Sequence, residues 1–175
     1  MKIKQQNINK SLLILLSLSF FVRAVLAMII EFGNDEVYYW TYAMYPDWSH
    51  FDHPPMVGWL IQLFSCNLLF DSEFFLRLSS IIFMTINTYL VFLIGRQVKN
   101  EQTGFYAALL YTASIYAFVI TGIFILPDTP LSIFTLLAVL QFVKYFQYEK
   151  NKHLLLAGLF TGLAMLSKYS GVFVW

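Results

Sequence analysis

The stretch SLLILLSLSFFVRAVLAMII, residues 11–30, decides the fold class of this chain. It has the roughly 20 residues that an α-helix needs to cross the apolar core of a bilayer, and Arg23 is its single charge. Similar apolar runs follow at residues 78–95, 104–126, 129–148 and 154–168. We therefore predict an all-α fold, a polytopic membrane helix bundle in which these five runs are the spans.

Composition supports a membrane protein and excludes several other classes. Apolar residues make up 59% of the 175 residues and charged residues only 12%, which lies outside the range of soluble globular proteins. The net charge of +1, without a basic patch interleaved with aromatic residues, argues against a nucleic-acid partner. The single cysteine, Cys66, excludes an internal disulfide and a cysteine zinc cluster.

The amino-terminal run has a second interpretation. A basic region leads into it, and residues 24–27 (AVLA) resemble a signal-peptide cleavage site. Arg23 interrupts the run, however, and its apolar character continues to Ile30, which favours an uncleaved first span. We expect Arg23 to reach the interface or to pair with a loop carboxylate, because a charge at the bilayer centre is costly.

The charges alternate between the loops in a way that predicts the topology. Basic residues flank one set of span ends, namely Lys2, Lys4, Lys10, Arg96, Lys99, Lys144, Lys150 and Lys152. By the positive-inside rule this side is cytoplasmic, and so is the amino terminus. Acidic residues mark the opposite, outer side, namely Asp35, Glu36, Asp47, Asp52, Asp71, Glu73 and Asp128.

An outer loop at residues 31–76 carries the polar chemistry. It contains DEVYYW at residues 35–40 and HFDHPP at residues 50–55. The Pro-Pro step predicts a rigid extended corner. The apolar run at residues 56–70 is too short to span, so we expect short helices at the interface or buried in the bundle. Carboxylates and imidazoles on such a scaffold indicate a functional site.

Two further ionisable residues are predicted on the same face. Asp128 lies at the turn between the third and fourth spans, where it either serves the site or caps a helix between two prolines. Lys168 lies at a predicted helix break at residues 168–171, where it either serves the site or extends to the interface as an anchor.

Together these features resemble a known family. An Asp-Glu pair before a Tyr pair (Tyr38 and Tyr39), His-Pro-Pro, Arg77-Leu78 at the next span, Pro127-Asp128 and Leu-Ser-Lys168 occur in the same order. In this order they are similar to membrane glycosyltransferases of GT-C architecture. More narrowly, they resemble the dolichyl-phosphate-mannose-protein mannosyltransferase family and its bacterial relatives, including lipid A aminoarabinose transferase. Such relatives continue beyond the position of Trp175, so we expect this chain to be the amino-terminal portion of the domain.

The resemblance implies a reaction and a location. A sugar is transferred from a polyprenyl-phosphate donor to an acceptor hydroxyl on protein, lipid or glycan. The reaction takes place at the outer face of a bacterial plasma (inner) membrane. Asp35 matches the acidic position next to the acceptor and Glu36 the second acidic position, so both are candidate catalytic residues. His53 and Lys168 match positions that would bind the donor phosphate. The further site candidates are Asp128, Tyr38, Tyr39 and Arg77.

Physical chemistry agrees with these roles. A polyprenyl phosphate leaves readily, so the reaction needs a carboxylate to take the acceptor proton and cations to hold the phosphate. One base and a fixed leaving group favour inversion at the oxocarbenium-like sugar carbon. The aromatic residues of the loop, Tyr38, Tyr39, Trp40 and Trp48, would stack on a sugar or form an interfacial belt.

Three alternatives remain open at this stage. A divalent metal ion is a candidate cofactor, with Glu36, His50, Asp52 and His53 as candidate ligands. A transporter or scaffold subunit would need ionisable groups near the bilayer midplane, whereas these groups cluster at the outer interface. An inactive fragment of a truncated gene is the third.

Overall fold

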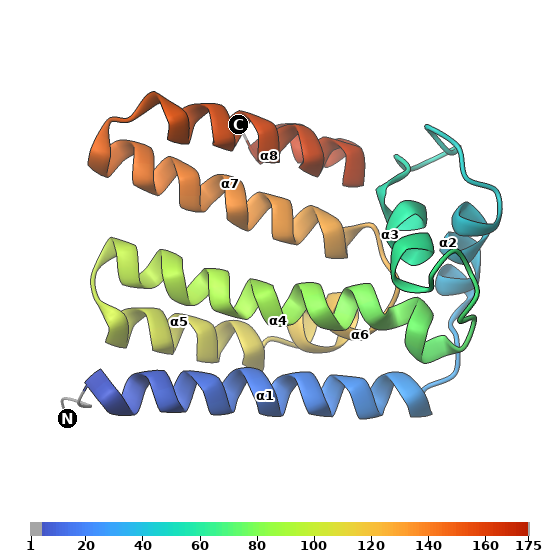
Figure 1. Cartoon of the computed structure of the whole chain (residues 1–175), viewed down its shortest axis with the longest axis horizontal. Coiled ribbons are helices and arrows are strands. Elements are labelled where there is room, and N and C mark those ends of the chain that lie inside the picture. Colours follow the sequence, from blue (N-terminus) through green and yellow to red (C-terminus); the bar gives the residue numbers. More distant parts are fainter. Residues whose placement is uncertain (1–4, 175) are drawn as a thin grey trace.

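Three long helices form the frame of the molecule, α1 (Gln5–Ile29), α4 (Glu73–Val98) and α7 (Asp128–Tyr148). In the computed structural model, which describes residues 5–174, each of them is long and apolar enough to cross a membrane. Figure 1 shows them side by side, with α4 in contact with both α1 and α7. Residues 5–174 contain no strand, which confirms the predicted all-α bundle.

Two shorter helices complete the bundle. α5 (Glu101–Ala113) packs along α4, and α8 (Asn151–Ser167) packs along α7. Gly95 and Gly104 let α4 and α5 approach closely, because a Cβ on Gly95 would lie 2.8 Å from the Cα of Gly104. Small residues at such contacts are typical of helix pairs in membranes.

Polar side chains also join the helices inside the bundle. The side-chain amide of Asn87 on α4 donates to the Ser132 hydroxyl on α7 at 2.8 Å. The Thr88 and Thr112 hydroxyls link α4 to α5 at 3.2 Å. In a membrane the lipid tails are as apolar as the side chains, so the hydrophobic effect does little to hold helices together. Hydrogen bonds such as these therefore help to fix the register of the helices.

The run at residues 104–126 does not form one helix. α5 ends at Ala113, and Ser114 adopts an extended backbone. A π-helical turn, η1 (Tyr116–Ile120), and the short α6 (Thr121–Ile123) follow, bent by 73° from α5. With this pair counted as one span, four spans meet the length and hydropathy criteria within the described residues.

Arg23 differs from its expected placement. Its side chain is fully buried, and Nε donates to the carbonyl of Phe118 at 3.3 Å. The guanidinium lies 4.7 Å from the centre of the Phe118 ring. Within residues 5–174 no carboxylate pairs with it, and Nη1 and Nη2 have no hydrogen-bond partner. Both expected placements, at the interface or beside a loop carboxylate, are therefore wrong for residues 5–174, because the bend at η1 covers this part of α1.

The loop between α1 and α4 folds into two short helices over one end of the bundle. These are α2 (Asn34–Met44) and α3 (Met56–Phe64), which pack against each other. A Cβ on Gly58 would lie 2.8 Å from the carbonyl oxygen of Tyr42, so only glycine permits this approach. Their shared core consists of Tyr39, Tyr42, Ala43, Val57, Ile61, Leu76 and Ile125.

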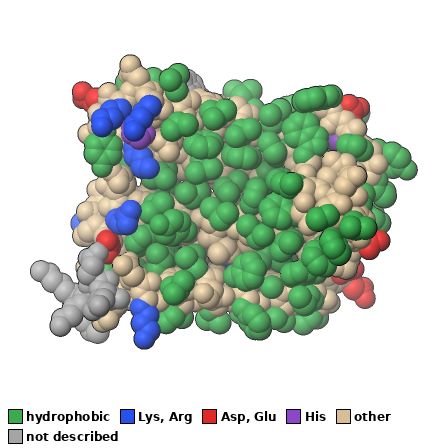
Figure 2. Space-filling view, in the orientation of Figure 1, with side chains coloured by type: hydrophobic (Ala, Val, Ile, Leu, Met, Phe, Trp, Pro, Cys, Tyr) green, Lys and Arg blue, Asp and Glu red, His purple; other side chains and the backbone are tan. Residues whose placement is uncertain are grey.

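The charges separate along the long axis of the bundle. Figure 2 shows Lys and Arg side chains toward the end where α1 begins and α7 meets α8. Acidic side chains lie at the opposite end, which carries α2 and α3, but also at the basic end, where Glu101 begins α5 and Glu149 follows α7. At that end α8 stops at Ser167, and a 3₁₀ segment, η2 (Tyr169–Val174), follows Lys168. The predicted helix break at Lys168 is thus present.

Candidate functional site

A buried ion pair lies beneath the loop helices. Glu36 and Arg77, whose side chains are 3% and 0% exposed, meet through two hydrogen bonds. Arg77 Nε donates to Glu36 Oε1 at 2.8 Å, and Nη2 donates to Oε2 at 2.6 Å. The parallel pair of bonds gives the strong, oriented geometry of an arginine–carboxylate fork.

The surroundings of this pair satisfy its remaining hydrogen-bonding groups. Each oxygen of Glu36 accepts a second bond, from the backbone N–H of Ile125 and of Gly33, both at 3.1 Å. Arg77 also donates to three carbonyls at the end of α1, those of Ala27, Ile30 and Glu31. With each oxygen held by two donors, the Glu36 carboxylate connects α1, α2, α4 and the segment before α7.

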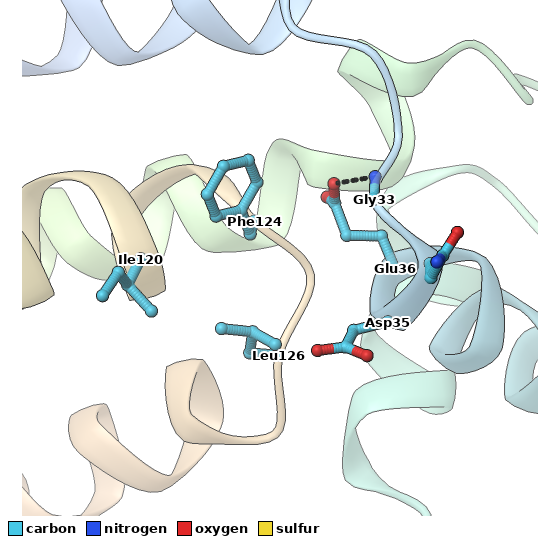
Figure 3. Close-up of a pocket in the computed structure, with 7 residues that line it drawn as sticks. Gly33, Asp35, Glu36, Ile120, Phe124 and Leu126 are labelled. Atoms are coloured by element: carbon cyan, nitrogen blue, oxygen red, sulfur yellow. Dashed lines mark hydrogen bonds between the residues drawn. The ribbon is translucent and has the colours of Figure 1, made fainter.

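Asp35 occupies a different environment although it is the next residue. It lies in the first turn of α2 and lines a pocket of about 390 Å³. Ile120, Phe124 and Leu126 form the opposite wall, and Figure 3 shows the Asp35 carboxylate directed toward Leu126 while Glu36 turns toward Gly33. Asp35 is exposed, and no donor among residues 5–174 bonds to it.

Tyr39 lies near three of the carboxylates that the sequence predicts on the outer face, those of Asp35, Asp52 and Asp128. Burial and, to a smaller extent, the negative charges of Asp52, Asp35 and Asp128 together raise the pKa of Tyr39 to about 12. Its ring stacks on the His53 imidazole with centroids 5.7 Å apart. The structure thus brings together residues from three separate segments around one tyrosine.

Asp52 is held by two tyrosines of α2. The Tyr38 and Tyr42 hydroxyls donate to Asp52 Oδ1 at 2.5 Å and 2.7 Å. These hydrogen bonds, the one from Tyr38 first, hold the pKa of Asp52 below its usual value. The Tyr42 ring also stacks on His50 with centroids 3.6 Å apart. The loop is therefore folded back over α2.

The structure does not gather the four candidate metal ligands. Within residues 5–174 there is no group of three or more His, Cys, Asp or Glu that could hold a metal ion. Glu36 is occupied by Arg77 and Asp52 by tyrosines, while the rings of His50 and His53 stack on other tyrosines. The candidate metal site is therefore not assembled among residues 5–174 in this arrangement. Nδ1 of His53 is buried and lacks a hydrogen-bond partner in the described part of the chain.

Lys168 and Asp128, two sequence-predicted site residues, form an ion pair. Lys168 Nζ lies 3.1 Å and 2.9 Å from the two carboxylate oxygens of Asp128. The Tyr116 hydroxyl donates to the same carboxylate at 2.9 Å. The side chain of Asp128 caps no helix. The lysine and aspartate side chains are 32% and 23% exposed, so water reaches this pair.

The outer loop also approaches Lys168 directly. The hydroxyls of Ser49, in the loop, and Tyr169, in η2, lie 3.3 Å apart. This contact joins the loop that carries Asp52 and His53 to the helix break that carries Lys168. The candidate site thus consists of the Asp35 pocket, the tyrosine-rich face of α2 and the pair formed by Lys168 and Asp128.

Sequence reasoning missed two members of this site. Tyr42 lies four residues after Tyr38, a spacing that places both on one helix face, so this signal was available. Tyr116 gave no local signal, because its contact with Asp128 depends on the π-helical turn. Arg77 was expected in the site, and the structure places it in the buried pair instead.

Two comparisons with known proteins agree with the geometry. The model of the dolichyl-phosphate-mannose-protein mannosyltransferase family matches residues 52–175. The chain belongs to this family. The lipid A galacturonosyltransferase RgtD of Rhizobium johnstonii is 28% identical over 145 residues, which cover 82% of this chain and 30% of that protein. The chain thus spans about a third of the length of this relative. No solved structure matches the chain.

Proposed function

We propose that this family member contributes the amino-terminal part of a membrane glycosyltransferase that uses a polyprenyl-phosphate sugar. The acceptor is a hydroxyl of a glycolipid of the lipid A type, the class named for the relative from Rhizobium johnstonii. The observation that carries the proposal is the exposed Asp35 carboxylate in a pocket, next to a Glu36 that is fully bonded. One of the two adjacent carboxylates is thus available for chemistry.

In the proposed reaction Asp35 accepts the proton of the acceptor hydroxyl. The acceptor oxygen forms a bond to the anomeric carbon of the sugar as the bond from that carbon to the phosphate oxygen breaks. The electron pair leaves with the polyprenyl phosphate, and a single displacement inverts the configuration. Its charge needs a cation nearby, because fixed charges aimed at a developing anion lower the barrier.

Lys168 is the proposed cation, assisted by His53. In the structure Asp128 occupies the Lys168 ammonium, so the donor phosphate has to replace or join this carboxylate. The exchange costs little, because a partly exposed ion pair contributes only about 0–1 kcal/mol. Glu36 acts as a positioning residue, since it fixes the first turn of α2 and hence Asp35.

Asp35→Asn in the intact protein tests the proposal. Loss of a general base should lower the transfer rate by about 10²-fold or more, with folding and donor binding unchanged. The assay follows transfer of sugar from polyprenyl phosphate to lipid A in membranes. Asp71→Asn, an exposed carboxylate of the same loop outside the site, is the matched control. Near-native turnover of folded Asp35→Asn would remove Asp35 from the mechanism.

The proposal also places the loop helices on the outer side of a bacterial inner membrane. Support comes from the basic residues at the opposite end of the bundle, which the positive-inside rule assigns to the cytoplasm. A membrane-impermeant thiol reagent should label Ser49→Cys in intact cells when Cys66 is replaced by Ser. Labelling that requires opened cells would reverse the orientation.

A further inference from the structure

The outer loop contains a second pocket, separate from the one at Asp35. Its volume is about 370 Å³, and it is lined by Pro46, Asp47 and Trp48 of the loop and by Trp59 of α3. It shares no lining residue with the Asp35 pocket. None of these four side chains has a role in the reaction described above.

The two tryptophans form the walls of this pocket. Their ring centroids lie 5.3 Å apart with the planes at 89°, so the edge of one indole meets the face of the other. Trp59 is partly buried on α3, whereas Trp48 is 81% exposed. A large aromatic surface is thus held out toward solvent by a rigid neighbour, although burial of a tryptophan is normally favourable.

Polar groups lie at the rim of this aromatic surface. Oδ1 of Asp47 accepts a hydrogen bond from the backbone N–H of Trp48 at 2.6 Å, which fixes the carboxylate beside the indole. No donor in residues 5–174 bonds to Oδ2 of Asp47, and the indole N–H groups of Trp48 and Trp59 are likewise unpaired there. The side chains that line the pocket therefore include one strong acceptor and two unpaired donors beside the aromatic rings.

This combination matches the chemistry of a pyranose ring. A pyranose has an apolar face of C–H bonds that stacks on an aromatic ring, and its rim of hydroxyl groups needs both donors and acceptors. An interfacial tryptophan anchor is the competing interpretation. It requires insertion of the Trp48 region into lipid, and the exposed Asp47 carboxylate opposes this because a charge in lipid is costly.

We propose that Asp47, Trp48 and Trp59 form a docking site for a sugar ring of the acceptor glycolipid. The inference rests on the proposed function and adds the place where the acceptor binds. The loop that carries Trp48 continues to Asp52 and His53 and contacts Tyr169 through Ser49. An acceptor whose sugar is bound at Trp48 stays at the same outer end of the bundle as Asp35. The local concentration of the acceptor at the Asp35 pocket is thereby raised.

Binding measurements on the intact, detergent-solubilised protein test this site. The probe is lipid A in mixed micelles, with phosphatidylglycerol in the same micelles as an anionic lipid without a sugar ring. Trp48→Ala and Asp47→Asn should each weaken lipid A binding by about tenfold, as expected for loss of one aromatic stack or one charge-assisted hydrogen bond. Binding of phosphatidylglycerol should stay the same.

Phe51→Ala is the matched control, because Phe51 is fully exposed on the same loop and does not line the pocket. Equal losses for lipid A and phosphatidylglycerol would assign Trp48 to a lipid anchor and overturn the proposal. Unchanged lipid A binding in Trp48→Ala, or no binding by the unmodified protein, would overturn it too.

Kinetics separate this proposal from the proposed function. Trp48→Ala should raise KM for lipid A about tenfold with little change in kcat, whereas Asp35→Asn should lower kcat. If Trp48→Ala weakens lipid A binding and Asp35→Asn keeps its turnover, the docking site stands and the catalytic assignment fails. The reverse pattern removes the docking site alone.

Discussion

Two ion pairs at the same end of the bundle differ in what surrounds them. Glu36 and Arg77 are dry, and both carboxylate oxygens are doubly bonded. Lys168 and Asp128 are partly exposed, with the Tyr116 hydroxyl as the further donor to the carboxylate. All four residues were predicted as site residues, from the predicted topology and the family resemblance. We refer to Glu36 with Arg77 as the framework pair and to Lys168 with Asp128 as the exchange pair.

The difference indicates which charges can meet a substrate. Removal of one partner from a buried pair leaves an unpaired charge in an apolar medium and costs about 3–5 kcal/mol. A partly exposed pair is screened by water and costs about 0–1 kcal/mol to break. In the proposed reaction the donor phosphate would therefore displace Asp128 from Lys168, whereas displacement of Glu36 from Arg77 would detach the loop from the bundle.

Glu36→Gln should have the largest effect, and the effect should be on stability. The amide keeps the shape but leaves the buried Arg77 charge with only the exposed Glu73 carboxylate, 3.8 Å away, so we expect destabilisation of about 3–5 kcal/mol. Thermal unfolding in detergent measures it, with Glu31→Gln, an exposed neighbour, as the control. A Glu36→Gln protein of native stability that has lost turnover would break the comparison and restore Glu36 as a catalytic residue.

Lys168→Gln comes next and should act on the donor. Loss of the ammonium should weaken binding of the polyprenyl-phosphate donor by about tenfold or more, with little change in stability. Asp128→Asn should leave donor affinity equal or higher, because it frees the lysine. Donor binding by titration tests both variants, with Lys152→Gln at the opposite end as the control. Equal losses in Lys168→Gln and Asp128→Asn would make the exchange pair structural.

Tyr116→Phe should have the smallest effect. This substitution removes one hydrogen bond to the Asp128 carboxylate. A hydrogen bond of this kind contributes about 0.5–1.5 kcal/mol. Because the ion pair remains, donor affinity should change by less than about tenfold. A donor titration compares this variant with Lys168→Gln. A loss as large as that of the lysine variant would show that Tyr116 contacts the donor itself.

The helical frame could be predicted because its cause is local. Apolar runs of spanning length form helices in lipid regardless of their partners, and α1, α4 and α7 follow this rule. The placement of Asp128 and Lys168 at the same end of the bundle was also predictable, since each pair of spans returns the chain to the same face, but their ion pair was not.

The separate fates of Asp35 and Glu36 could not be predicted in the same way. Adjacent helical residues point about 100° apart, so one faces the pocket and the other the bundle, but which one depends on tertiary contacts. The decisive partner of Glu36 is Arg77, 41 residues further along the chain. The break at Ser114 could not be predicted either, because no proline or glycine at this position indicates it in the sequence. A contact with Arg23 of α1 supports the π-helical turn instead.

The broken third span also has a mechanical consequence. At the basic end α4 and α5 are in backbone contact through Gly95 and Gly104, so that end of the helical hairpin is stiff. We expect flexibility instead in the bent segment after Ala113. Its residues Ile120, Phe124 and Leu126 form one wall of the Asp35 pocket. If the proposed function holds, we expect this wall, rather than the long helices, to be displaced when the isoprenoid-linked donor enters the pocket.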